Sequence, residues 1–190
     1  KIKYSRIVLF FFCILLSFYL IKNTSSEILF TSVIGGAAIF LMFMSIKEFL
    51  QKNYNVSQTI SHFGFSLFVL SILFNSLFST EFSSNMKIGE EISYKKDQIK
   101  FLNIKTFEKE NYKSLIANFE ITDAKNNTIS LYPEIRIYNQ PNILTSEADI
   151  ISTIFFDKFV VINLLKGEEI FNVRYQTKPF MIWIWISTCL

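Results

Sequence analysis

Three long stretches without a charged side chain fill most of the first 80 residues. They cover residues 7–21, 28–46 and 53–80, with lengths of 15, 19 and 28 residues. A helix needs about 20 mostly apolar residues to cross a bilayer, and flanking basic side chains extend the reach of a shorter one. We therefore predict a membrane region over residues 1–80, with three transmembrane helices at about 7–22, 28–46 and 57–79. A signal peptide is the alternative for the first stretch, but no small-residue cleavage site follows it.

A fourth apolar run begins near the C-terminus. Residues 180–190 carry no charge, but 11 residues are too few to cross a bilayer. We predict that residues 179–190 form the start of a further, truncated transmembrane helix. Because the chain also begins without a methionine, we expect it to be a fragment of a larger polytopic membrane protein.

The basic residues of the membrane region predict its orientation. Lys1, Lys3 and Arg6 precede the first stretch, and Lys47 and Lys52 lie between the second and the third. Short loops rich in lysine and arginine stay in the cytoplasm. The charge-rich block that follows the third stretch is therefore expected outside the cytoplasm, which means the periplasm of a protein in a bacterial inner membrane. The mitochondrial inner membrane is the alternative.

Residues 81–178 differ from the membrane region in both charge and pattern. Residues 81–190 contain 13 basic and 14 acidic side chains, an ordinary balance for a surface in water. Short runs of β-branched and aromatic residues, separated by turn sequences, are typical of an antiparallel sheet. We predict a small all-β extracytoplasmic domain, a sandwich or a barrel, and residues 147–153 fit either a short helix or an extended segment. The runs cover residues 115–121, 128–132, 135–138, 159–164 and 170–175.

The sequence of the predicted β domain excludes several kinds of chemistry. It contains no histidine, no cysteine, no glycine-rich phosphate loop and no Gly-x-Ser-x-Gly motif, so we expect no self-contained nucleophilic or zinc site and no catalytic residue. Cys13 and Cys189 both fall in apolar runs and are not expected to pair. The net charge of +3 comes without a basic, aromatic-rich face, so nucleic acid is not expected as a partner. Membrane lipid is.

His62 is the only histidine in the chain, and it lies inside the third uncharged stretch. An ionisable side chain within a membrane is expensive and suggests a function. Neutral imidazole also binds metals, including haem iron. The residues alone favour a histidine that hydrogen-bonds within the helix bundle or reaches the interface. A proton relay in a transporter segment would call for further acidic groups, and residues 53–80 contain none.

Several short motifs follow one another in a distinctive order. The string closely resembles the C-terminal third of the CcmF and NrfE family, the large haem-lyase subunits of cytochrome c maturation, and the resemblance covers most of residues 28–188. Its members are Ser61-His62-Phe63-Gly64, Asn111-Tyr112, residues 133–138, 145–148 and 157–160, and Lys178-Pro179-Phe180 leading into Trp183-Ile184-Trp185.

The resemblance implies a role for His62 that the residues alone do not. It matches the histidine that serves as an axial ligand of a membrane-embedded haem b in this family. The second ligand and a tryptophan-rich haem-binding loop would then lie outside this fragment. The implied partners are a haem chaperone, thioredoxin-like maturation subunits and apocytochrome c. The implied activity is that of a holocytochrome-c synthase subunit, with the fragment alone inactive. A non-catalytic scaffold for cytochrome assembly is the alternative.

Three further residues are candidates for contact with haem. Arg136 can pair with a haem propionate because guanidinium binds carboxylates through two hydrogen bonds, although an ion pair with Glu134 is the simpler interpretation. Trp183 and Trp185 can stack on a haem, although aromatic residues at the edge of a span more often form an interfacial belt. Ser187 stands where the family pattern leads us to expect a glycine.

Overall fold

The computed structural model describes residues 4–23, 27–51, 55–165 and 170–190. Three of the lysines that predict the orientation, Lys1, Lys3 and Lys52, lie outside these residues. The chain divides into two compact units. The helical unit comprises Lys1–Ser79, Thr153–Phe156 and Lys178–Leu190, and the β unit comprises Thr80–Ser152 and Asp157–Thr177.

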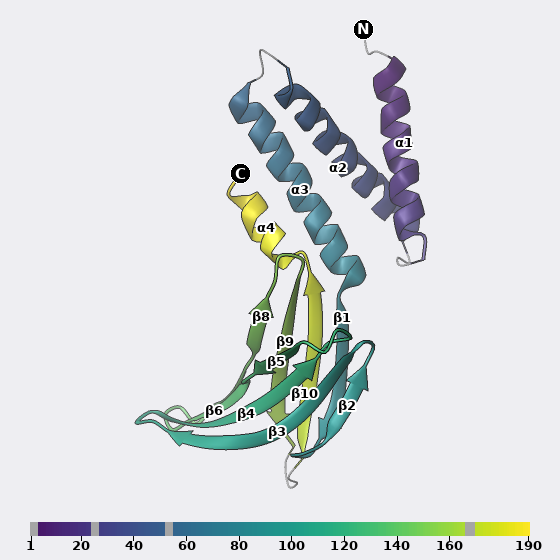
Figure 1. The fold of residues 1–190 in the computed structure, drawn as a ribbon. Helices are drawn as coiled ribbons and strands as arrows, with labels where there is room; N and C mark the ends of the chain where they lie inside the picture. Colours follow the sequence, from purple (N-terminus) through teal and green to yellow (C-terminus); the bar gives the residue numbers. More distant parts are fainter. Residues whose placement is uncertain (1–3, 24–26, 52–54, 166–169) are drawn as a thin grey trace. The chain divides into compact units, whose positions relative to one another are not determined.

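The described residues of the helical unit form four helices, which Figure 1 draws as coiled ribbons. The first three are long and apolar enough to cross a membrane. The third begins after Asn55, whose side-chain oxygen accepts a hydrogen bond from the Gln58 N–H at 3.3 Å, the usual way to satisfy a free donor in a first turn. The helices are α1 (Tyr4–Ile21), α2 (Ile28–Phe49), α3 (Val56–Phe78) and α4 (Met181–Thr188).

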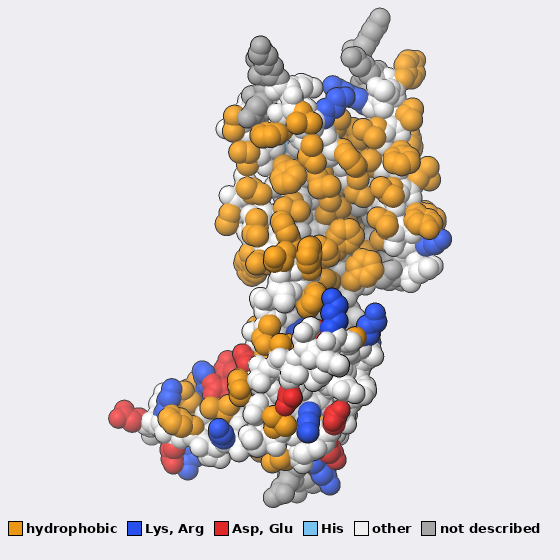
Figure 2. Space-filling model, viewed as in Figure 1, with side chains coloured by type: hydrophobic (Ala, Val, Ile, Leu, Met, Phe, Trp, Pro, Cys, Tyr) orange, Lys and Arg blue, Asp and Glu red, His pale blue; other side chains and the backbone are white. Residues whose placement is uncertain are grey.

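Small and weakly polar side chains fill the contacts between these helices. At Gly36 on α2, an added Cβ would lie 2.6 Å from the Ile14 Cα of α1, so the two backbones approach too closely for any side chain at that position. Large apolar side chains instead cover the outside of the helices (Figure 2). Close approach through small residues is how helices pack in lipid, where burying apolar side chains gains little. The buried small residues include Ser17, Ser32, Gly35, Ala38, Ser45, Thr59, Gly64, Ser66 and Ser71.

Within the described part of the β unit, ten strands form two antiparallel sheets. One sheet has the order β1-β10-β9-β8, and the other has the order β2-β3-β4-β6-β7, with β5 also paired to β4. Residues 147–153, which the sequence leaves undecided, are extended and contribute to β7 and β8. The strands are β1 (Thr80–Met86), β2 (Glu91–Tyr94), β3 (Asp97–Glu108), β4 (Tyr112–Thr122), β5 (Thr128–Leu131), β6 (Glu134–Tyr138), β7 (Leu144–Glu147), β8 (Asp149–Ser152), β9 (Phe156–Leu164) and β10 (Phe171–Pro179).

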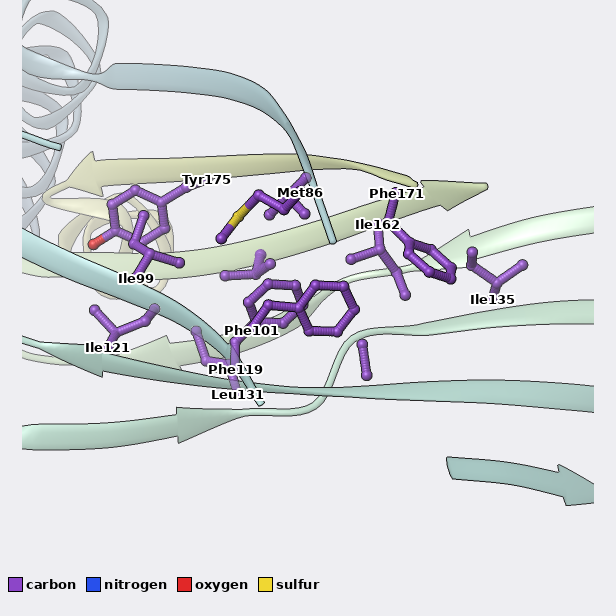
Figure 3. Close-up of a cluster of buried hydrophobic side chains, with 13 residues drawn as sticks. Met86, Ile99, Phe101, Phe119, Ile121, Leu131, Ile135, Ile162, Phe171 and Tyr175 are labelled. Atoms are coloured by element: carbon purple, nitrogen blue, oxygen red, sulfur yellow. The ribbon is translucent and has the colours of Figure 1, made fainter. Parts of the chain in front are cut away.

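One hydrophobic core lies between the two sheets (Figure 3). Phe101 of β3 and Phe119 of β4 stack with ring centroids 4.5 Å apart, and Phe171 of β10 meets Phe101 edge-on at 5.6 Å. Both sheets supply fully buried side chains to this cluster, as the alternation of inward and outward residues along a strand predicts. Apolar helices together with an antiparallel two-sheet domain confirm the predicted fold class.

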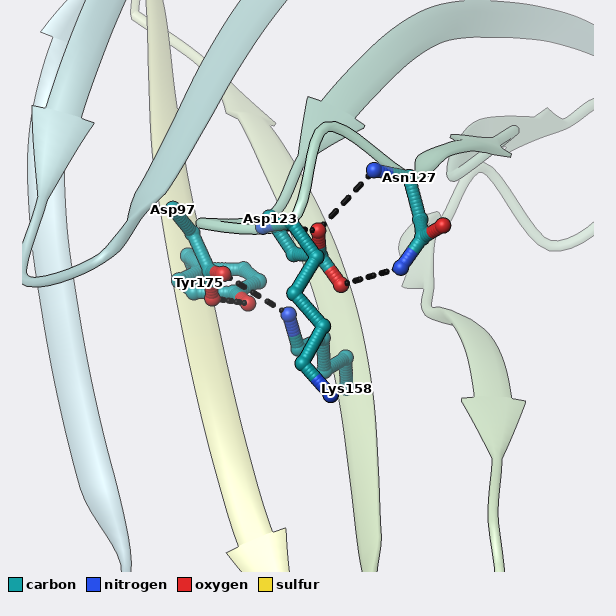
Figure 4. A network of polar contacts seen from close by, with 6 residues as sticks. Asp97, Asp123, Asn127, Lys158 and Tyr175 are labelled. Atoms are coloured by element: carbon teal, nitrogen blue, oxygen red, sulfur yellow. Dashed lines mark hydrogen bonds and ion pairs between the residues drawn. The ribbon is translucent and has the colours of Figure 1, made fainter.

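A buried polar cluster links the two sheets at one edge of the core (Figure 4). Asp97 of β3 accepts a hydrogen bond from the Tyr175 hydroxyl of β10 at 2.6 Å and forms an ion pair with Lys158 of β9 at 2.9 Å. Burial, followed by the hydrogen bond to Asp97, raises the pKa of Tyr175. The cluster supplies hydrogen-bond partners to three polar groups that lose hydration on folding.

Candidate functional site

His62 lines a pocket of about 410 Å³ within the helical unit. The pocket lies among α1, α2 and α3, and His62 is its contribution from α3. Its volume falls in the range typical of ligand-binding pockets, roughly 300–1,000 Å³. The remaining lining residues are Arg6, Ile7 and Phe10 from α1, and Phe40, Leu41, Met44, Ser45 and Glu48 from α2.

The pocket combines apolar walls with a few polar groups. Its walls are aliphatic and aromatic side chains, among which Phe10 and Phe40 meet edge-on at 5.4 Å. The Ser45 hydroxyl is already used, because it donates to the Leu41 carbonyl at 2.9 Å. His62, Arg6 and Glu48 are thus the side chains left to recognise a ligand. This balance of apolar surface and convergent polar groups is that of a small-molecule or cofactor site.

The donor set of the pocket fits a flat, apolar cofactor with its own metal better than a bare metal ion. No group of three or more His, Cys, Asp or Glu side chains that could hold a metal ion occurs among the described residues. Haem iron, in contrast, already has four porphyrin nitrogens and takes a single imidazole from one side. The apolar walls suit the porphyrin, and the Arg6 guanidinium suits a propionate.

Sequence reasoning named His62 but missed Arg6 as a neighbour in the same pocket. Arg6 lies on α1 and His62 on α3, and in the sequence Arg6 indicates only the orientation of the membrane region. Its one detectable signature is a lone arginine at the start of an otherwise uncharged apolar run. That the pocket joins it to His62 follows from the packing of α1 and α3 around α2.

Arg136 lies in the β unit, on β6, where its side chain already has a partner. It forms an ion pair with Glu134 and lies 5.3 Å from the ring centroid of Tyr112. Ser114 donates a second hydrogen bond to Glu134 at 2.5 Å. Burial raises the pKa of Glu134, but the hydrogen bonds from Ser114 and Arg136 lower it more, so that the pKa lies below its ordinary value. The ion pair that the sequence favours for Arg136 is therefore present.

Trp183 and Trp185 lie on α4, and neither lines the His62 pocket. Trp185 is 67% exposed. The indole N–H of Trp183 is buried without a hydrogen-bond acceptor among the described residues. Ser187, where a glycine fits the family pattern, is buried with its hydroxyl donating to the Ile184 carbonyl at 2.8 Å. A serine can therefore occupy this position without leaving its hydroxyl unsatisfied.

Gly64 allows α3 and α4 to approach each other closely. A Cβ added at Gly64 would lie 2.8 Å from Leu190 Cβ and 3.3 Å from the Ser187 carbonyl oxygen. Any larger residue at this position would push α4 away from α3. Of the motif Ser61-His62-Phe63-Gly64, the histidine thus contributes to the pocket and the glycine to the contact between helices.

Apolar helices of membrane-spanning length, joined to an antiparallel β-sandwich, define the class of this chain: a membrane protein that carries a folded β domain between its helices. The family model described as "CcmF C-terminal beta-sandwich" matches residues 77–179, more than half of the chain. The chain therefore belongs to the CcmF family.

Individual relatives agree with this assignment. The chain is 29% identical to cytochrome c-type biogenesis protein CcmF of Escherichia coli (strain K12), over 97% of this chain and 30% of that protein. It is 26% identical to the protein of the same name from Haemophilus influenzae, over 76% of this chain and 22% of that one. The chain thus spans less than a third of the length of these relatives.

A solved structure shares the fold. The structure titled "Cytochrome c Heme Lyase CcmF" superposes with a TM-score of 0.71 and 13% sequence identity, covering 96% of this chain and 32% of that one. Its helices and β domain therefore follow the same arrangement along the chain. At this level of identity the likeness shows the fold alone.

Proposed function

We propose that this segment is part of a membrane haem lyase that acts in cytochrome c maturation, where it binds haem and helps to attach it to apocytochrome c outside the cytoplasm. The names of the relatives support this proposal, since they are cytochrome c-type biogenesis proteins and a cytochrome c haem lyase. The observation that carries it is the presence of His62 in an apolar pocket of about 410 Å³.

His62 is the proposed axial ligand of a haem b, on one side of the iron. A neutral imidazole nitrogen would make the bond, and the second ligand would come from a part of the protein beyond this segment. The aromatic walls, including Phe10 and Phe40, would pack against the porphyrin of a bound haem. The Arg6 guanidinium would pair with a propionate carboxylate. A bound haem b would supply a redox-active iron within the membrane.

The β domain has a separate proposed role as a docking platform. Its exposed surface carries charge of both signs, as Figure 2 shows, and its buried groups form a sandwich core rather than a catalytic site. We assign it to the periplasmic side of a bacterial inner membrane, where a haem chaperone, thioredoxin-like subunits and apocytochrome c would meet it. The segment alone is expected to be inactive, because the second haem ligand and the tryptophan-rich haem-binding loop would lie outside it.

Replacing His62 with alanine in the full-length protein tests the ligand assignment. We expect His62→Ala to remove most of the haem absorbance per mole of purified protein, because one axial bond is lost. Added imidazole should restore part of that absorbance by filling the vacated space. The matched control is Ser61→Ala, an exposed neighbour on the same helix, which should leave the spectrum unchanged. Size-exclusion chromatography of each variant shows whether the protein still folds.

Two other outcomes would reject the assignment. If His62→Ala folds and keeps its haem spectrum, His62 is not a ligand. If the full-length wild-type protein is colourless when isolated from cells supplied with haem, the non-catalytic scaffold is the better explanation. The same assay distinguishes the roles of Arg6 and Arg136. Arg6→Gln should weaken haem retention, because Arg6 lines the pocket. Arg136→Gln should not, because Arg136 is paired with Glu134 in the β unit.

A further inference from the structure

The connection between β8 and β9 exposes large apolar side chains at its tip. Ile154 is 61% exposed and Phe155 is 60% exposed. No charged residue occurs from Ile150 to Phe156. Single exposed apolar residues are ordinary, but adjacent ones in an uncharged stretch mark a contact surface.

This tip belongs to the helical unit, although the strands on either side of it belong to the β unit. The Phe180 N–H, at the start of α4, donates to the Phe155 carbonyl at 2.8 Å. The rings of Phe155 and Phe180 meet edge-on with centroids 6.3 Å apart, and Phe180 lies 5.3 Å from Phe74 of α3. An apolar surface therefore continues from the last turn of α3, through Phe180, to the tip.

The tip is a closed turn with a fixed backbone. The Thr153 N–H and hydroxyl both donate to the Phe156 carbonyl, at 3.0 and 2.6 Å. Phe180 has a φ of 59°, a left-handed conformation that is rare for a bulky residue and persists only where the surroundings hold it. The bond to Phe155 holds its N–H, and Asn75 of α3 donates to the preceding carbonyl, that of Pro179, at 2.7 Å. The exposed side chains are thus presented from a preorganised position.

We propose that this tip inserts Ile154 and Phe155 into the interfacial layer of the lipid bilayer, beside the ends of α3 and α4. The occupant of the apolar surface is lipid, because the surface is uncharged and continues the apolar exterior of α3, a helix long and apolar enough to cross the membrane. Apolar side chains inserted in this way lie about 5–10 Å into the boundary between head groups and acyl chains. The strands of the sandwich then have a third membrane attachment, in addition to α3 and α4. This proposal does not depend on haem binding.

A fluorescent probe at the tip tests the proposal. An environment-sensitive fluorescent amino acid is introduced at position 155, by suppression of a stop codon, into the full-length protein in lipid nanodiscs. We expect blue-shifted emission that is quenched when nitroxide-labelled phospholipids replace part of the lipid. Position 154 serves as a second site, in case the substitution at 155 disturbs the ring contact with Phe180.

Position 88 provides the matched control. Ile88 is apolar and 53% exposed, as the tip residues are, but it belongs to the β unit and has charged neighbours in the sequence, Lys87 and Glu90-Glu91. Charged neighbours favour water over lipid at this position, so the same probe at 88 should show red-shifted emission that nitroxide lipids do not quench.

The two optical signals distinguish the occupants of the surface. Blue-shifted emission without quenching at both 154 and 155 would mean that protein covers the tip, either another part of the full-length chain or a partner. Red-shifted, unquenched emission would mean that water does. Either result overturns the proposal, and neither bears on whether His62 binds haem.

Discussion

The two units bury opposite kinds of side chain. The β unit encloses the largest fully buried side chains among the described residues, such as Phe101, Phe119 and Tyr175, and carries most of its charges outside. The helical unit buries mainly small residues, such as serine and glycine, between its helices, and it turns most of its large apolar residues, such as Phe11 and Leu15, outward. Water drives the first arrangement by the hydrophobic effect. Lipid gives no comparable drive, so the helices instead pack through small residues that allow close backbone contact.

The largest expected effect comes from truncating the same aromatic side chain in the two units. Phe119→Ala should lower the free energy of unfolding of the β unit by about 3–5 kcal/mol, because the buried ring leaves a cavity beside Phe101. Phe65→Ala should cost within about 0.5 kcal/mol, because Phe65 is 61% exposed on α3 and leaves no cavity. Thermal unfolding of the purified full-length protein, localised by hydrogen exchange, measures both. Equal losses would mean that the helical unit also depends on buried aromatic residues.

Enlarging a small buried residue should destabilise the helical unit, which truncating an exposed aromatic residue should not. Gly36→Leu should destabilise the contact between α1 and α2 by about 1–3 kcal/mol or more, because even a Cβ there would lie 2.6 Å from the Ile14 Cα. Ala37→Leu is the control, since Ala37 is exposed on the same helix and has room for the larger side chain. Resistance of the full-length protein to a denaturing detergent gives the comparison. If both variants are equally stable, close backbone contact is not what holds these helices together.

A smaller effect distinguishes the polar interior of the β unit. Tyr175→Phe removes the hydrogen bond to Asp97 and should cost about 1 kcal/mol at neutral pH. The pKa of Tyr175 is raised in the folded protein, above the ordinary value of about 10. Its contribution to stability is therefore present in full below about pH 10 and is lost as the pH rises towards the folded-state pKa. The wild-type protein should lose stability more steeply in alkali than Tyr175→Phe does.

The control for this comparison is Tyr132→Phe, in which an exposed tyrosine is changed. It should follow the wild-type protein at every pH. Denaturant unfolding of the β unit at several alkaline pH values measures all three proteins. An unchanged alkaline slope in Tyr175→Phe would assign the sensitivity to another group.

The strands that the sequence predicts are those whose own residues favour extended structure. The run 115–121, which alternates apolar and polar residues from Ala117 onward, lies within β4, and 159–164 lies within β9. The segment Thr80–Met86 carries no such signal, because most of its residues are serine, threonine, asparagine and glutamate. It forms β1 because it pairs with β10 residue by residue, from Thr80 opposite Thr177 to Met86 opposite Phe171. Pairing with a distant strand overrides local preference there.

The candidate site likewise has some features that the sequence predicts and others that only the packing of the helices determines. A single histidine in an uncharged run is visible in the sequence, and so is the competing partner of Arg136, since Glu134 lies two residues away on the same face of a strand. The residues that share the pocket with His62 are not visible in the sequence. Arg6 and Glu48 line its pocket because of how three helices pack, and a one-dimensional pattern of apolar residues does not specify the rotation of each helix about its axis.

Because of their spacing, His62 and Gly64 lie on opposite sides of α3. Residues two apart on an α-helix point about 200° away from each other, so the imidazole faces the pocket with α1 and α2 while the glycine faces α4. A displacement of α4 would therefore act on the back of the same helical turn that presents the histidine. An event that moves the helix following the β domain could thus reach the ligand position through one turn of backbone, without any side chain in between.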